Sequence, residues 1–173
     1  MRLPHIADPE RFADPRTRRI MSHRWSTTDL LEELLGEPVS VAAAYIGAAL
    51  PELFPTLRPP PREILLARRT TLATPTRPDV SENVVIALDG ISDQVAAAIL
   101  DRRTPLGRSL RRIPHRRIPD TCGLTRWPHG EPGSAASKCY QIAEPPGYAP
   151  TIHVHETFNP TIFGPDLAAP PPR

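Results

Sequence analysis

The sequence has little of several features that narrow a protein's function. Its 173 residues include two cysteines, Cys122 and Cys139, which are too few for a disulfide framework. It has no apolar run of about 18 residues, the length that spans a membrane. Residues 1–20 carry charges throughout and lack the apolar segment of a secretory signal. These absences predict a cytoplasmic protein with reduced thiols and no membrane partner, and a single extracellular disulfide is the alternative.

Proline, in contrast, is abundant, with 24 residues. Because proline interrupts helices and strand ladders, we expect long connections and irregular ends. Residues 1–23 are predicted to form a loosely ordered arm, and residues 164–173 a proline-rich tail. Hydrophobic residues make up 39% and charged residues 23%, which is typical of a globular chain with one core. The formal net charge of +2 selects no class of partner.

The pattern of apolar residues predicts an α+β fold. A first helix is expected to begin at one of the N-cap candidates 26–29, of which Asp29 could form a capping box with Glu32, and to stop at Gly36. A second helix is expected after Ser92, and a third opens with Thr104 as N-cap and Pro105 as its first residue. Strands are expected over residues 39–41, 62–67, 83–88, 113–119, 138–143 and 151–158. Residues 68–79 and 120–135 are expected to form loops. Strands that follow one another without regular helical crossovers indicate an antiparallel sheet covered by a few helices.

The last predicted strand carries the first candidate for chemistry. Ile152, Val154, Glu156 and Phe158 alternate and therefore share one face, which is apolar except for Glu156. Burial raises the pKa of a carboxyl group, and a neutral carboxylic acid can donate a proton to a leaving oxygen. The alternative is a buried glutamate in a structural ion pair.

Arg62 begins the same face as the apolar residues of its own predicted strand. A guanidinium there can bind a substrate carboxylate through two parallel hydrogen bonds, and the alternative is a solvated strand end. Residues 104–107 place free backbone N–H groups at a helix start, which attracts anions but is also a common way to begin a helix.

Two further patterns have weaker functional interpretations. Residues 102–117 carry seven arginines. They predict either a surface that binds nucleic acid, or a solvated helix face whose positive electrostatic field attracts an anionic substrate. His153 and His155 are predicted to lie on the outer face of the last strand. No further ligands stand at a convincing spacing, so no metal is expected.

Six short motifs within residues 24–163 occur in the same order as in a known protein family. They are residues 26–32, 39–41, 62–66, 81–86, 104–107 and 154–158. Through these motifs the chain resembles the chorismate pyruvate-lyase family. The resemblance implies one domain with an antiparallel sheet of about six strands and helical flaps over a buried ligand cavity.

The resemblance also implies a function. Arg62 would hold the ring carboxylate of chorismate, Glu156 would meet the ether oxygen, and the backbone near Thr27, Leu106 and Gly107 would line the pocket. The reaction would release pyruvate and 4-hydroxybenzoate without a cofactor, in a monomer or weak homo-oligomer. Thr27 departs from the family pattern, which has a larger apolar residue there.

Two other interpretations remain. The first is a non-catalytic module of the same fold that binds an aromatic acid. The second is a nucleic-acid-binding protein that uses residues 102–117. The presence of both Arg62 and Glu156 favours the enzyme, with chorismate as the partner and no nucleic acid.

Overall fold

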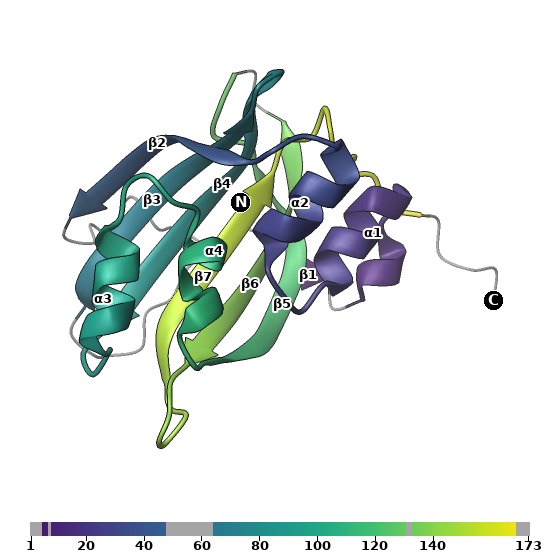
Figure 1. The fold of residues 1–173 in the computed structure, drawn as a ribbon. Coiled ribbons are helices and arrows are strands. Elements are labelled where there is room, and N and C mark those ends of the chain that lie inside the picture. The colour runs from purple at the N-terminus through teal and green to yellow at the C-terminus, as the bar shows by residue number, and fades with distance from the viewer. Residues whose placement is uncertain (1–4, 7, 48–63, 131–132, 169–173) are drawn as a thin grey trace.

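The chain forms one antiparallel sheet with its helices over one face (Figure 1). The structure, a computed structural model, describes residues 5–6, 8–47, 64–130 and 133–168. The sheet has seven strands in the order β1-β5-β6-β7-β4-β3-β2, and all neighbouring pairs are antiparallel. This confirms the predicted α+β class and the antiparallel sheet. No described helix is both long enough and apolar enough to cross a membrane.

The elements have the following bounds. The strands are β1 (His5–Ile6), β2 (Ser40–Gly47), β3 (Ile64–Thr74), β4 (Arg77–Leu88), β5 (Arg116–Arg126), β6 (Ser134–Ala143) and β7 (Pro150–Phe158). The α-helices are α1 (Pro15–Ser22), α2 (Thr27–Leu35), α3 (Asp93–Leu100) and α4 (Leu106–Ser109). Two short 3-10 helices are η1 (Pro9–Arg11) and η3 (Leu110–Arg112).

The two predicted amphipathic helices form as expected, for local reasons. The Ser26 side chain accepts a hydrogen bond from the Asp29 backbone N–H and so caps α2. Gly36 ends that helix with a φ of 68°, which glycine adopts without strain. Ser92 caps α3 in the same manner by accepting from the Val95 N–H. The apolar faces of both helices pack onto the sheet.

Two segments predicted as loops are instead extended strands. Strand β3 continues to Thr74 and β4 begins at Arg77, so most of residues 68–79 lies in the sheet. Arg68 was included in this polar loop, but its side chain is fully buried. It donates hydrogen bonds to the Thr70 hydroxyl at 2.8 Å and to the carbonyls of Ala98 and Thr104 at 3.1 and 2.8 Å.

The second such segment is residues 120–135. Strand β5 continues to Arg126 and β6 begins at Ser134, because the two strands pair along their whole length. The proline-rich connection predicted over residues 51–61 lies outside the described residues, as does Arg62.

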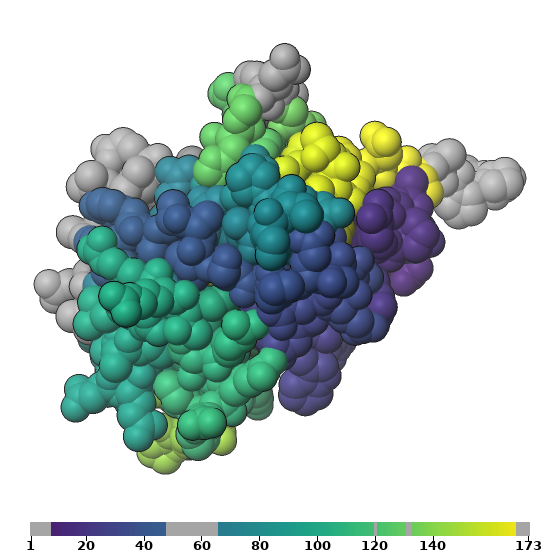
Figure 2. Space-filling view, turned by 45° about the horizontal axis from the view of Figure 1, so that its top comes forward, coloured from purple at the N-terminus to yellow at the C-terminus, as the bar shows by residue number. Residues whose placement is uncertain are grey.

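The N-terminal segment differs from the loose arm that its composition predicts. Asp14 caps α1, and Pro15 occupies the first turn of that helix. Phe12 and Ile20 are fully buried in one core cluster with Phe158. The start of the tail lies against this segment, because the Ala13 N–H donates to the Asp166 carbonyl at 2.8 Å. Figure 2 shows the same contact between the purple and yellow residues.

Because α1 belongs to the core, shortening Ile20 should destabilise the whole protein. We expect Ile20→Ala to lower the free energy of unfolding by about 2–5 kcal/mol, measured by urea denaturation. Leu100→Ala is the matched control, since Leu100 is 53% exposed and its truncation should have little effect. An equally small loss in both variants would show that α1 is not part of the core.

Candidate functional site

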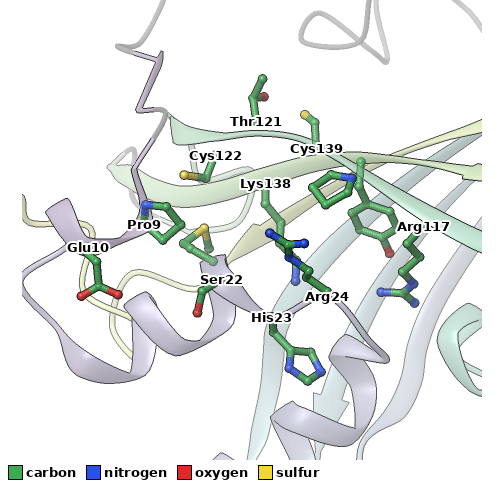
Figure 3. Close-up of a pocket in the computed structure, with 13 residues that line it drawn as sticks. Pro9, Glu10, Ser22, His23, Arg24, Arg117, Thr121, Cys122, Lys138 and Cys139 are labelled. Carbon is green, nitrogen blue, oxygen red and sulfur yellow. The ribbon is translucent and has the colours of Figure 1, made fainter.

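A pocket of about 370 Å³ opens between the N-terminal helical segment and strands β5 and β6 (Figure 3). Residues 21–24, at the end of α1 and just after it, form one wall. The opposite wall comes from side chains of the two strands, among them Arg117, Lys138 and Tyr140. The helix wall is made by the segment whose composition predicted a loose arm.

Glu156 lies behind this wall, in the interior. Its residue is 5% exposed and shares the core face of β7 with buried Val154 and Phe158, which confirms the predicted orientation. The Thr27 hydroxyl donates to Glu156 Oε2 at 2.8 Å, and the Tyr140 hydroxyl donates to Oε1 at 3.1 Å. Thr27 and Glu156, both predicted as site residues, are therefore in direct contact.

Lys138 is the partner that sequence analysis missed. It lies directly opposite Glu156 on the neighbouring strand, and its Nζ is 3.4 Å from Glu156 Oε2. The same nitrogen donates to the Ile20 carbonyl at 3.1 Å. Burial lowers the pKa of Lys138, and the charge of Arg117 acts in the same direction, whereas Glu156 opposes both. One signal was present, because Lys138 is the chain's only lysine.

Tyr140 connects the ion pair to the pocket. The Arg117 guanidinium carbon lies 4.8 Å from the centre of the Tyr140 ring, a cation–π arrangement. Burial raises the pKa of Tyr140, so its hydroxyl stays protonated and remains a donor to Glu156. Arg117 also donates to the Trp25 carbonyl, which holds it beside the connection between α1 and α2.

The described lining of the pocket has a surplus of positive charge. Arg24, Arg117 and Lys138 lie toward one end, and the lining carboxylate Glu10 lies toward the other (Figure 3). Glu10 is paired with Arg18 at 3.7 Å, so it does not neutralise the cationic end. Counting Glu156 behind the wall, three cations face one carboxylate there. Such a pocket attracts anionic ligands.

The remaining predicted site residues lie near the start of α2. A Cβ added to Gly107 would meet the Ser26 and Thr28 hydroxyl oxygens at 3.2 and 3.3 Å, so α4 begins directly against α2. Leu106 is the first residue of α4 and is half-buried. Pro105 stands at the N-cap without a side-chain cap bond, so Thr104 does not cap this helix as predicted. In the described lining of the pocket, Thr27, Leu106 and Gly107 do not appear.

The arginine-rich stretch does not act as one surface. Arg108 forms an ion pair with Glu32, and Arg111 forms one with Asp29. Both pairs tie the α4 region to α2, whereas Arg117 belongs to the pocket wall. Two of the seven arginines are therefore engaged in ion pairs with α2, and a third lines the pocket.

The histidine pair was predicted to lie on an outer face, and this is wrong for His155. Its residue is 7% exposed, because the second face of β7 is also covered at this position. Within the described part of the chain, no group of three His, Cys, Asp or Glu side chains is arranged to hold a metal ion.

Burial of His155 should make stability depend on pH. Burial lowers the pKa of its imidazole from 6.5 to about 4. Between these values the unfolded chain binds a proton at this position and the folded chain does not, so stability falls as the pH drops through this window. We expect His155→Gln to remove a loss of up to about 3 kcal/mol, measured by urea denaturation from pH 7 to pH 4. Equal pH dependence in both proteins would contradict a buried neutral imidazole.

Comparison with protein-family models and with curated proteins gives no match to this chain. The chemistry available at the site is set by its own groups. They are a buried amine, a buried carboxylate, a phenol that keeps its proton and a guanidinium that faces the pocket.

Proposed function

We propose that the protein is a cofactor-free lyase that eliminates pyruvate from chorismate and leaves 4-hydroxybenzoate. The observation that carries this proposal is the position of Glu156. Its buried carboxyl group is hydrogen-bonded to Thr27 and Tyr140 and lies beside Lys138, at the wall of a cationic pocket. The same residue ends the motif through which the chain resembles the chorismate pyruvate-lyase family.

Charge and size support a small dianion as the substrate. Chorismate carries two carboxylates on a compact ring, and a pocket of about 370 Å³ falls in the range of small-molecule sites. Arg117 presents a planar guanidinium, which binds carboxylates through two parallel hydrogen bonds. In this proposal Arg62, outside the described residues, holds the ring carboxylate, and Arg117 with Lys138 receives the enolpyruvyl carboxylate.

The reaction needs proton transfer and positioning. The bond between the ring and the ether oxygen breaks, and the adjacent hydroxyl-bearing ring carbon loses its proton as the ring becomes aromatic. The departing enolpyruvate takes up a proton and becomes pyruvate. In this proposal Glu156 is the source of the proton that the ether oxygen receives, and Lys138, which lines the pocket and lies 3.4 Å from Glu156, passes the proton to the substrate. Aromatisation of the ring supplies the driving force.

A second candidate is a binding module for an aromatic acid. The observation that favours it is that Thr27, Tyr140 and Lys138 all contact the Glu156 carboxyl group, as in a structural buried ion pair. In this case the cationic pocket holds the ligand and no bond is broken.

The test is to mix the purified protein with chorismate and to follow 4-hydroxybenzoate and pyruvate together. We expect equimolar products, and we expect Glu156→Gln to slow turnover by about 10²–10⁴-fold, the usual contribution of a general acid. Arg62→Ala should also lose activity.

Glu33→Gln is the matched control, since the Glu33 side chain is 61% exposed and does not line the pocket, and it should leave turnover unchanged. Absence of turnover in the unmodified protein would contradict the proposed lyase activity. Binding of 4-hydroxybenzoate without turnover would then establish the binding module.

A further inference from the structure

Lys138 has a setting that a merely structural lysine does not need. It lines the pocket while its residue is only 5% exposed, so its side chain borders the ligand space and its amine contacts groups of the protein interior. Burial lowers the pKa of its ammonium group, and the neighbouring guanidinium of Arg117 acts in the same direction, whereas Glu156 raises it without reversing the shift. Lysines in such settings supply the neutral amine that attacks carbonyl carbons.

Glu156 completes the chemistry that this amine requires. Its Oε2 is 3.4 Å from the Lys138 Nζ, which is short enough for the ammonium proton to pass to the carboxylate after a small movement. The transfer would convert the buried ammonium and carboxylate into a neutral amine and a neutral acid. Burial favours these neutral forms, whereas the hydrogen bonds that Thr27 and Tyr140 donate to Glu156 favour its carboxylate. The amine is then nucleophilic, and the acid stands ready to protonate an oxygen.

We propose that Lys138 forms a Schiff base with a small 2-oxo acid bound in this pocket. The nitrogen lone pair adds to the carbonyl carbon, and the carbonyl oxygen takes the proton from Glu156. The nitrogen then returns one proton to the Glu156 carboxylate, which passes it to the new hydroxyl group. The hydroxyl leaves as water, and a protonated carbon–nitrogen double bond replaces the carbonyl beside the Glu156 carboxylate. No oxidant, reductant or metal is needed to balance these steps.

The substrate class follows from the neighbouring charges. Arg117 lies over the Tyr140 ring beside Lys138, and Arg24 lines the same pocket, so a carboxylate next to the carbonyl has cationic partners. A 2-oxo acid presents both groups on adjacent carbons, whereas a simple ketone lacks the carboxylate. The inference concerns the pocket of the proposed function but does not require chorismate to be its substrate.

The test is reductive trapping. The folded protein is incubated with pyruvate and sodium cyanoborohydride, which reduces an imine to a stable secondary amine, and the adduct is located by peptide mapping. Because the chain has a single lysine, the N-terminal amine is the only competing site. We expect an adduct on Lys138 whose rate saturates with pyruvate concentration. Pyruvamide, which lacks the carboxylate, should react at least about tenfold more slowly if one ion pair with Arg117 is lost.

Lys138→Arg is the matched variant, because it keeps a cation beside Glu156 but cannot form the imine. It should carry no adduct at position 138, and its circular dichroism should match that of the unmodified protein. An adduct confined to the N-terminal amine, or no adduct at all, overturns the inference. The trapping uses no chorismate, so its result is independent of whether the protein is a lyase.

Discussion

The interior of this protein contains an ammonium and a carboxylate 3.4 Å apart, contributed by Lys138 on β6 and Glu156 on β7. Removing two charges from water costs several kcal/mol for each ion, which only good geometry and further hydrogen bonds offset. Those bonds come from Thr27 on α2, Tyr140 on β6 and the Ile20 carbonyl on α1. The pair is therefore satisfied only when two helices and two strands are in place together, and the same placement forms the pocket.

A second buried cation, Arg68 on β3, contacts helix α3 and the α4 region in a similar way. Arg68 donates to the Ala98 carbonyl in the last turn of α3, much as Lys138 donates to the Ile20 carbonyl in the last turn of α1. Carbonyls in a last turn lie at the negative end of the helix dipole, so a cation suits both positions, although the Ile20 carbonyl also accepts a hydrogen bond from the His23 backbone N–H at 3.3 Å. A buried cation on a strand thus connects the sheet to each of these helices, Arg68 on β3 to α3 and Lys138 on β6 to α1.

Sequence patterns predicted the elements that depend on local rules and missed those that depend on burial of charge. The cap at Ser26, the stop at Gly36 and the inward face of Glu156 follow from neighbouring residues, and the structure confirms them. The burial of Arg68 was missed, because the carbonyls that accept its hydrogen bonds belong to Ala98 and Thr104, which lie far along the chain. Lys138 was missed because its partner is on another strand, while the role of Arg62 stays a prediction.

Lys138 belongs both to the buried ion pair and to the lining of the pocket, so a ligand in the pocket should be detected at this residue. The measurement uses protein labelled isotopically at its single lysine and follows the Cε resonance by NMR as 4-hydroxybenzoate is added. We expect a saturable shift of this resonance, which Arg117→Ala weakens because the carboxylate loses a cationic partner. A resonance that stays unchanged, whether the ligand binds elsewhere or does not bind, would show that the pocket beside Lys138 is not the ligand site.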